Sequence, residues 1–127
     1  IGSHPHVLRP METLTGEDGH KMLVYYSLGN FVATQNDLPC LLGGMAKITI
    51  RKDLETGEIQ IPNHEYIPLL MYYERENPKA AVYKLEEYPE ELVEKHSVYK
   101  KNPGEFSLEY YQNLFNKIKE QGNEDAI

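Results

Sequence analysis

The sequence contains one cysteine and no tryptophan, and it lacks long hydrophobic runs. A single cysteine excludes an intrachain disulfide, so folding does not depend on oxidation. No apolar run reaches the ~18 residues that a membrane helix requires, so no membrane span is predicted in this segment. Basic residues are also scarce, 13 against 20 acidic ones, for a net charge of -7. Nucleic acid is therefore not a predicted partner, because phosphate binding requires clustered lysine and arginine.

What is present is typical of a folded domain. The chain has 127 residues, of which 40% are hydrophobic and 26% are charged. These values match those of soluble globular proteins, and the length suits one ordinary domain. Ten tyrosines stand out in a chain with only three phenylalanines. We expect most of these tyrosines to be partly buried packing residues, with stacking on a sugar or peptide as the alternative.

The first third of the chain predicts a hairpin. Residues 7–14 are interrupted by Pro10 and suit an extended segment, and residues 22–26 form a short apolar run rich in strand formers. The turn cluster at 15–20 joins them. A second turn, Ser27-Leu28-Gly29-Asn30, follows the run, and residues 34–44 are predicted to be a loop.

A second hairpin is predicted further along. Apolar residues alternate with polar ones from residue 46 to residue 51, which is typical of a half-exposed strand. The turn at 53–58 leads to residues 59–73, where Pro62 and Pro68 predict a bent strand at a sheet edge.

The pattern changes after Tyr73 and becomes helical beyond Pro78. Pro89 suits the first turn of a short helix that His96 would end, where a cation complements the helix dipole. Ser107 is a good N-cap for a second helix, which Gly122 would stop. Strands come first and helices last, so the predicted fold class is α+β.

His4-Pro5-His6 is the arrangement that most resembles a site. In an extended backbone, residues i and i+2 point to one face about 6.5 Å apart, so both imidazoles could reach one metal ion or a close pair of ions. Imidazole suits Zn, Mn, Fe or Ni, so the pair does not select a metal. The alternative is a chance spacing among five histidines. Two histidines are also too few for a hydrolytic metal site.

Other candidates are weaker. Asn30 or Ser27 could be presented to a ligand by their turn, although turns use such residues for backbone reasons alone. His20 and His64 are expected to be solvated or cross-strand residues. Cys40 has no motif around it and is expected to be a structural thiol.

Two blocks of the sequence carry a family resemblance. They are Gly2-Ser3-His4-Pro5-His6-Val7-Leu8-Arg9-Pro10 and Val24-Tyr25-Tyr26-Ser27-Leu28-Gly29-Asn30-Phe31-Val32. With their spacing, they resemble the C-terminal part of the bacterial capsule-synthesis CapA/PgsA family, linked to poly-γ-glutamate capsules. That family is similar in fold to the calcineurin-like metallophosphoesterases. The resemblance extends more loosely through residues 83–96 and the helix that begins near Phe106.

The resemblance implies specific roles. His4 and His6 match the two histidines of the last metal motif and would ligate a two-metal centre, commonly Mn, Fe or Zn. The turn from Ser27 to Asn30 matches the one behind this motif, with a role in shaping the pocket or, for Asn30, in binding substrate. Ser3 and Arg9 depart from the family, where many relatives carry histidine and glutamine, but neither departure removes a ligand.

The resemblance also implies a larger protein. Residues 1–73 would be the last strands of a four-layer α/β sandwich, and residues 74–127 a helical extension packed on that core. The remaining metal ligands would lie in a missing N-terminal part, so this fragment would carry no catalytic residue and would not be active alone. The implied function is that of a capsule biosynthesis protein with a metal-dependent hydrolase site. The alternatives are a non-catalytic scaffold of a surface polymer-synthesis complex, with other capsule synthesis membrane proteins as partners, and a plain α+β domain. The implied location is the outer side of a bacterial membrane, with an anchor outside this segment.

Overall fold

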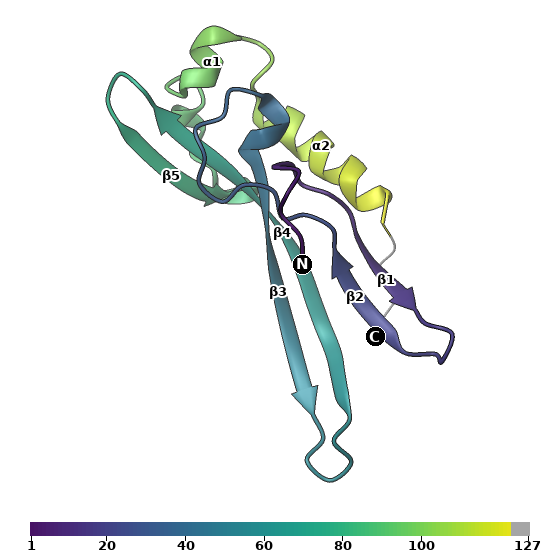
Figure 1. Ribbon diagram of the computed structural model, residues 1–127. Helices are drawn as coiled ribbons and strands as arrows, with labels where there is room; N and C mark the ends of the chain where they lie inside the picture. Colours follow the sequence, from purple (N-terminus) through teal and green to yellow (C-terminus); the bar gives the residue numbers. More distant parts are fainter. Residues whose placement is uncertain (123–127) are drawn as a thin grey trace.

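The computed structural model describes residues 1–122, in which two antiparallel sheets precede the helices (Figure 1). The strands are β1 (Met11–Thr15), β2 (Lys21–Tyr25), β3 (Leu42–Lys52), β4 (Ile59–Glu74) and β5 (Lys79–Lys84). The helices are α1 (Ser97–Lys101) and α2 (Leu108–Glu120), with short 3-10 segments η1 (Leu38–Leu41), η2 (Leu85–Glu87) and η3 (Glu90–Leu92). The predicted α+β class is confirmed, and the arrangement is compatible with a fragment of an α/β sandwich.

The first predicted hairpin is confirmed as β1 paired with β2. Met11 lies opposite Tyr25, and Thr15 lies opposite Lys21. The two strands meet at a tight turn in which the Gly16 carbonyl accepts a hydrogen bond from the Gly19 amide at 3.0 Å. Gly19 has a φ of 80°, a conformation that glycine adopts without steric cost.

The second hairpin is also confirmed and is much longer. β3 has 11 residues and β4 has 16, and Figure 1 shows their far ends projecting away from the helices. Asp53 shapes the connecting turn, because its carboxylate accepts hydrogen bonds from the Glu55 and Thr56 amides, both at 2.8 Å. These donors lower the pKa of the Asp53 carboxyl. β3 begins at Leu42, so the predicted loop at 34–44 ends three residues earlier than expected.

The prediction that residues 59–73 form an edge strand is wrong for residues 69–73, which pair with β5, whereas residues 59–68 pair with β3 alone. The order of the sheet is β3-β4-β5, so β4 lies in its centre. The prolines are tolerated for two local reasons. Pro62 lies where the β3–β4 register shifts, and pairing with β5 begins only at Leu69, after Pro68. A proline at a bulge or beside an unpaired edge removes no ladder hydrogen bond.

Residues 79–84 form strand β5, where the sequence pattern had predicted helix. The strand places Ala80 and Ala81 opposite Tyr73 and Tyr72 of β4. Both tyrosines are buried. Pairing that covers these large side chains outweighs the weak local preference for helix. The pairing of β4 with β5 runs from Leu69 to Glu74 and so spans residue 73, and the division into residues 1–73 and 74–127 stays a prediction.

His96 is not the cation at the end of a short helix that the sequence suggested. It is fully buried and forms the N-cap of α1, where its Nδ1 accepts the Val98 amide at 3.0 Å. Its Nε2 therefore carries the proton and donates to the Met71 carbonyl at 3.1 Å. The ring also stacks on Phe106, with centroids 4.5 Å apart. Burial lowers the pKa of His96 to about 4, so the ring is neutral.

Helix α2 follows the sequence prediction closely. Ser107 is its N-cap, with the hydroxyl accepting the Tyr110 amide at 3.0 Å. The buried side chains Tyr111, Phe115 and Ile118 face the core. Phe115 meets the Tyr66 ring of β4 at 5.7 Å between centroids, and Tyr66 in turn meets Tyr25 of β2 at 5.1 Å. One hydrophobic core thus joins α2 to both sheets, and the expected packing role of most tyrosines is confirmed.

Replacing Ser107 by alanine is expected to lower the free energy of unfolding by about 1 kcal/mol, because the helix loses the acceptor for its Tyr110 amide. Urea unfolding followed by circular dichroism measures the change. Ser107→Asn keeps a capping oxygen and is the matched control, with a stability near that of the wild type. An equal loss in both variants would contradict a capping role.

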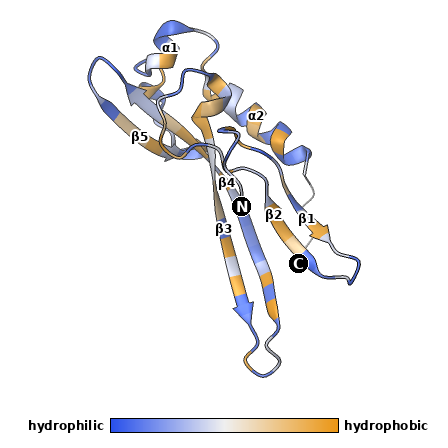
Figure 2. Ribbon diagram, in the orientation of Figure 1, coloured by the Kyte–Doolittle hydropathy of each residue, from blue (hydrophilic) through white to orange (hydrophobic). Residues whose placement is uncertain are grey.

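Large exposed hydrophobic side chains are confined to one part of the described chain. Ten of them have exposed fractions of 40% or more, all between Ile1 and Ile59: Ile1, Leu14, Met22, Tyr26, Phe31, Val32, Met45, Ile50, Leu54 and Ile59. Figure 2 shows hydrophobic bands along β1 and β2 and a hydrophilic loop between them. Residues 60–122 leave no large hydrophobic side chain exposed in this way.

Candidate functional site

The segment that carries His4 and His6 is a loop, and both of its ends pair with one strip of chain, residues 25–28. At one end the Gly2 amide donates to the Tyr25 carbonyl, and the Gly2 carbonyl accepts from the Leu28 amide, both at 2.9 Å. At the other end Leu8 forms an antiparallel bridge with Leu28. The chain therefore leaves this strip and returns to it within five residues, which requires a turn.

The expectation that His4 and His6 lie on an extended backbone is therefore wrong. The Ser3 carbonyl accepts a hydrogen bond from the His6 amide at 3.2 Å, closing a turn with His4 and Pro5 at its centre. His6 itself has a φ of 57° in the left-handed region, the only non-glycine residue of the described chain with a positive φ. Such a backbone is unfavourable for histidine and persists only when its surroundings hold it.

Hydrogen bonds with Asn30 hold His6 in this conformation. The Asn30 amide nitrogen donates to the His6 carbonyl and to the Cys40 carbonyl, both at 3.2 Å. These contacts orient the amide so that its Oδ1 faces the His6 ring, 2.8 Å from Nδ1. Because an amide oxygen only accepts, His6 Nδ1 must carry the proton. His6 Nε2 then keeps a free lone pair on an exposed ring.

This arrangement fits metal ligation by His6. Histidines that bind metals commonly donate their second ring N–H to an oxygen, which sets the tautomer and the ring orientation. His4 is exposed on the same turn. Within residues 1–122, no group of three or more His, Cys, Asp or Glu side chains could hold an ion together. This turn thus presents two exposed imidazoles, a type of ligand that several divalent transition metals accept.

Two residues of the turn behind the histidines, Ser27 and Asn30, have different roles. Ser27 is fully buried, and its hydroxyl accepts the Gly29 amide at 3.1 Å, so it maintains the turn. Gly29 has a φ of 65° and lies close to Leu8, where a side chain would be crowded. Asn30 follows and reaches His6. Sequence reasoning placed Asn30 near the motif through the family resemblance, but it did not foresee the contact with His6.

The remaining sequence candidates lie in structural roles. His20 is exposed in the β1–β2 turn, and His64 is half-buried opposite Ile48 in the β3–β4 hairpin. Cys40 is half-buried, and burial together with nearby Asp37 raises the pKa of its thiol. A raised pKa disfavours the thiolate, so Cys40 is not an activated nucleophile.

Comparison with known proteins gives a family-model match to this part of the chain. Residues 1–35 match the family model described as bacterial capsule synthesis protein PGA_cap. The matched residues include the turn with His4 and His6, Asn30 and the whole of β1 and β2. No curated protein and no solved structure matches the chain. The match supports a bacterial capsule synthesis protein, and such a role is associated with the cell surface. Separately, no helix in residues 1–122 is long and apolar enough to cross a membrane.

Proposed function

We propose that this chain is part of a poly-γ-glutamate capsule biosynthesis protein of the CapA/PgsA type, with a metallophosphoesterase-like hydrolase site. His4 and His6 would contribute two ligands to a two-metal centre, and residues outside the described chain would complete it. The observation that carries the proposal is the hydrogen bond from His6 Nδ1 to Asn30 Oδ1 at 2.8 Å, which leaves Nε2 available on an exposed ring.

The strained backbone conformation of His6 supports a functional role for this residue. A histidine in the left-handed region is strained by about 1–3 kcal/mol, and such strain clusters at functional sites. Here two hydrogen bonds between Asn30 and His6, together with the Ser3–His6 turn, hold His6 in that conformation, and a third bond ties Asn30 to the Cys40 carbonyl. If the turn only connected strands, a glycine at position 6 would serve it with less strain.

The chemistry of the site would be divided between the bound ions and the chain. Bound divalent ions would polarise a phosphoester-like bond and lower the pKa of a coordinated water. His6 would hold an ion through Nε2, with Asn30 keeping Nδ1 protonated. His4, two residues away on the same turn, would be the second ligand. Asn30 would therefore act as a positioning residue, and its predicted contact with substrate stays a prediction.

A further part of the same protein is the proposed partner. The exposed hydrophobic side chains gather in residues 1–59, the half of the chain that also contains His4 and His6. Burying such side chains against a second surface would stabilise an assembly by about 25 cal/mol for each Å² of apolar area covered. An N-terminal part that covers this surface could also bring the missing acidic and histidine ligands to the turn.

The test is the metal content of the full-length protein that carries this chain. Elemental mass spectrometry is expected to find near-stoichiometric Mn, Fe or Zn in the wild type and a sharp loss in the His4→Ala/His6→Ala double variant. Asn30→Ala is expected to weaken metal affinity by roughly 10–100-fold, the usual effect of removing a partner of a ligating histidine. His20→Ala removes an exposed histidine from a different turn and should retain the metal.

Two outcomes would decide against the proposal. A full-length protein that stays empty after incubation with Mn, Fe and Zn would exclude the two-metal site and favour the scaffold reading. Metal that remains in the double variant at the wild-type level would remove His4 and His6 from the ligand set. Capsule that persists in the double variant after hydrolysis is lost would also favour a scaffold.

A further inference from the structure

A concave surface lies outside the segment matched by the family model. It is a cavity of about 730 Å³ formed by the β4–β5 hairpin, η3 and Lys95. Its volume falls within the range of roughly 300–1,000 Å³ that small-molecule sites occupy. The residues that matter for its chemistry are Tyr72, Glu74, Lys79, Tyr83, Leu92 and Lys95. None of them takes part in the turn that carries His4 and His6.

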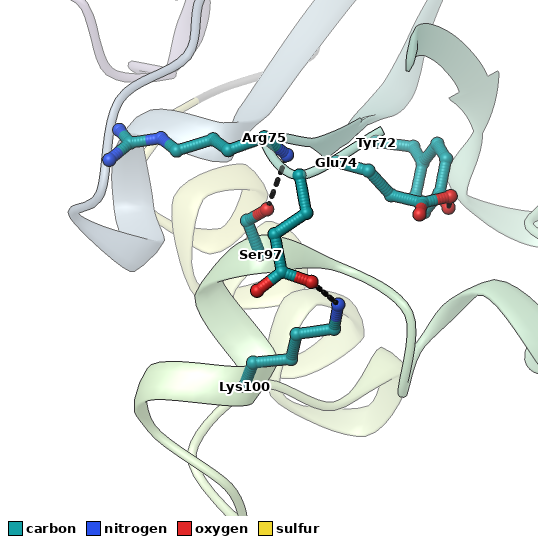
Figure 3. Close-up of polar contacts among 6 residues, drawn as sticks. Tyr72, Glu74, Arg75, Ser97 and Lys100 are labelled. Carbon is teal, nitrogen blue, oxygen red and sulfur yellow. Dashed lines mark hydrogen bonds and ion pairs between the residues drawn. The ribbon is translucent and has the colours of Figure 1, made fainter. Parts of the chain in front are cut away.

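One wall of the cavity carries a fixed negative charge. The Tyr72 hydroxyl donates a hydrogen bond to the Glu74 carboxylate. Figure 3 shows both side chains on the same side of β4, whereas the Arg75 side chain extends in the opposite direction. The backbone amide of Arg75 donates to Ser97 Oγ at 2.9 Å. Tyr72 is 3% exposed, so its ring is anchored in the core and holds the carboxylate in place. A carboxylate can accept further hydrogen bonds after this one.

Two positive charges face the same space from separate elements. Lys79 begins β5, and Lys95 follows η3. Lys47, Lys84 and Lys100 form ion pairs elsewhere in residues 1–122, whereas Lys79 and Lys95 form none in the described part of the chain. Lys79 lies directly across the ladder from Glu74, yet the two form no ion pair in the described structure. Both cavity lysines can therefore bind an anion without breaking an ion pair.

Apart from Asn77, the rest of the lining is apolar. Tyr83 and Leu92 belong to it, together with the side chains of Pro78, Ala80 and Ala81. The Tyr83 ring is held edge to face against Tyr88, with centroids 5.5 Å apart. A simple inorganic anion would make no use of this surface. A ligand with a hydrocarbon body would contact it and would keep its charged groups near the lysines and the glutamate.

From this combination we propose that the cavity binds a zwitterionic ligand of the amino-acid class with an apolar side chain. Its carboxylate would be held by Lys79 and Lys95. Its ammonium group would donate to the Glu74 carboxylate. Its side chain would lie against Tyr83 and Leu92. The proposal is independent of the metal site, because it uses neither His4 nor His6.

The test uses three probes that share one hydrocarbon body and differ in charge. L-Phenylalanine carries both charges, N-acetyl-L-phenylalanine only the carboxylate, and L-phenylalaninamide only the ammonium group. Each is titrated into the chain while the backbone amide NMR signals of the non-proline residues in the range 77–83 are followed. Phenylalanine is expected to bind at least about tenfold more tightly than either analogue, a difference of about 1.4 kcal/mol.

Charge-removing variants assign each group to its partner. Lys79→Gln/Lys95→Gln is expected to weaken phenylalanine at least tenfold and to leave phenylalaninamide unchanged. Glu74→Gln should do the reverse, weakening phenylalaninamide while sparing N-acetyl-phenylalanine. Lys117→Gln removes an exposed lysine of α2 and is the matched control, with wild-type affinities for all three probes.

The outcomes that would overturn the proposal are equally specific. Saturating phenylalanine that leaves the signals of residues 77–83 unmoved would exclude the site. Equal affinity for all three probes would show an apolar surface without charge recognition. Tighter binding of N-acetyl-phenylalanine than of phenylalanine would assign the cavity to simple carboxylates and remove Glu74 from it. Metal content would not change in any of these cases, so this proposal and the proposed function can fail separately.

Discussion

Replacing His96 by phenylalanine is expected to lower the free energy of unfolding by about 2–4 kcal/mol. The new ring can keep the stacking on Phe106, but it can neither accept from the Val98 amide nor donate to the Met71 carbonyl. A buried polar group without a partner costs about 1–3 kcal/mol, and His96 is fully buried. Urea unfolding of the wild type and the variant at neutral pH measures the difference.

The same residue should make the wild type sensitive to acid. The pKa of His96 is about 4 in the folded protein and near 6.5 for an ordinary histidine. The unfolded chain therefore binds a proton that the folded chain does not bind between these pH values. Stability is fully present above pH ~6.5 and falls as the pH decreases toward ~4, by roughly 3 kcal/mol in total.

The two effects can be separated by comparing variants. His96→Phe should lose the part of the acid sensitivity that begins near pH 6.5. His96→Asn keeps an oxygen that can cap α1, so it should be more stable than His96→Phe while also losing that acid sensitivity. His20→Gln removes an exposed histidine and should behave like the wild type. An unchanged pH profile in His96→Phe would show that His96 does not cause the acid sensitivity.

Replacing Gly43 by alanine is expected to destabilise the fold by roughly 3 kcal/mol. A Cβ at this position of β3 would lie 2.2 Å from the backbone oxygen of Asn30. The neighbouring atom belongs to the main chain, so it cannot rotate away, and relief requires movement of the backbone. Asn30 is the residue that holds His6, so the substitution should also disturb the turn with the two histidines.

A second glycine substitution, Gly19→Ala, separates the effect of steric crowding from the effect of backbone conformation. Gly19 has a φ of 80° with nothing within 4 Å of an added Cβ, so Gly19→Ala should cost only about 1–2 kcal/mol. Urea unfolding gives both values, and the backbone amide NMR signals of the non-proline residues in the range 3–7 report the turn. Equal destabilisation by the two substitutions, with these signals unmoved in Gly43→Ala, would contradict a close packing of β3 against Asn30.

Local patterns carried the prediction of most elements. Alternating residues in β3 predicted a half-exposed strand, and the turn signals at 15–20 and 53–58 predicted two hairpins, because each depends on residues close in sequence. Ser107 identified the start of α2 for the same reason. β5 was missed because its strand conformation depends on Tyr72 and Tyr73 of another strand, which no local pattern of residues 79–84 reveals.

In the candidate site, too, the sequence identified the residues, whereas tertiary contacts determine their geometry. The spacing of His4 and His6 and the resemblance around them marked the segment from sequence alone. The turn that holds them, and the left-handed backbone of His6, depend on hydrogen bonds to residues 25–28 and to Asn30, which lies 24 positions away. Such contacts form only when distant segments pack together, so the extended geometry predicted from spacing was wrong.

The sequence by itself determined the α+β class, the two hairpins, the capped C-terminal helix and the identity of the two candidate ligands. Only the tertiary structure decided which nitrogen of His6 is free, why His96 is buried and neutral, and how Glu74, Lys79 and Lys95 meet at one cavity. The physical reason is that periodicity and capping act between neighbours along the chain. Protonation, burial and the convergence of charges depend on the whole environment of a side chain.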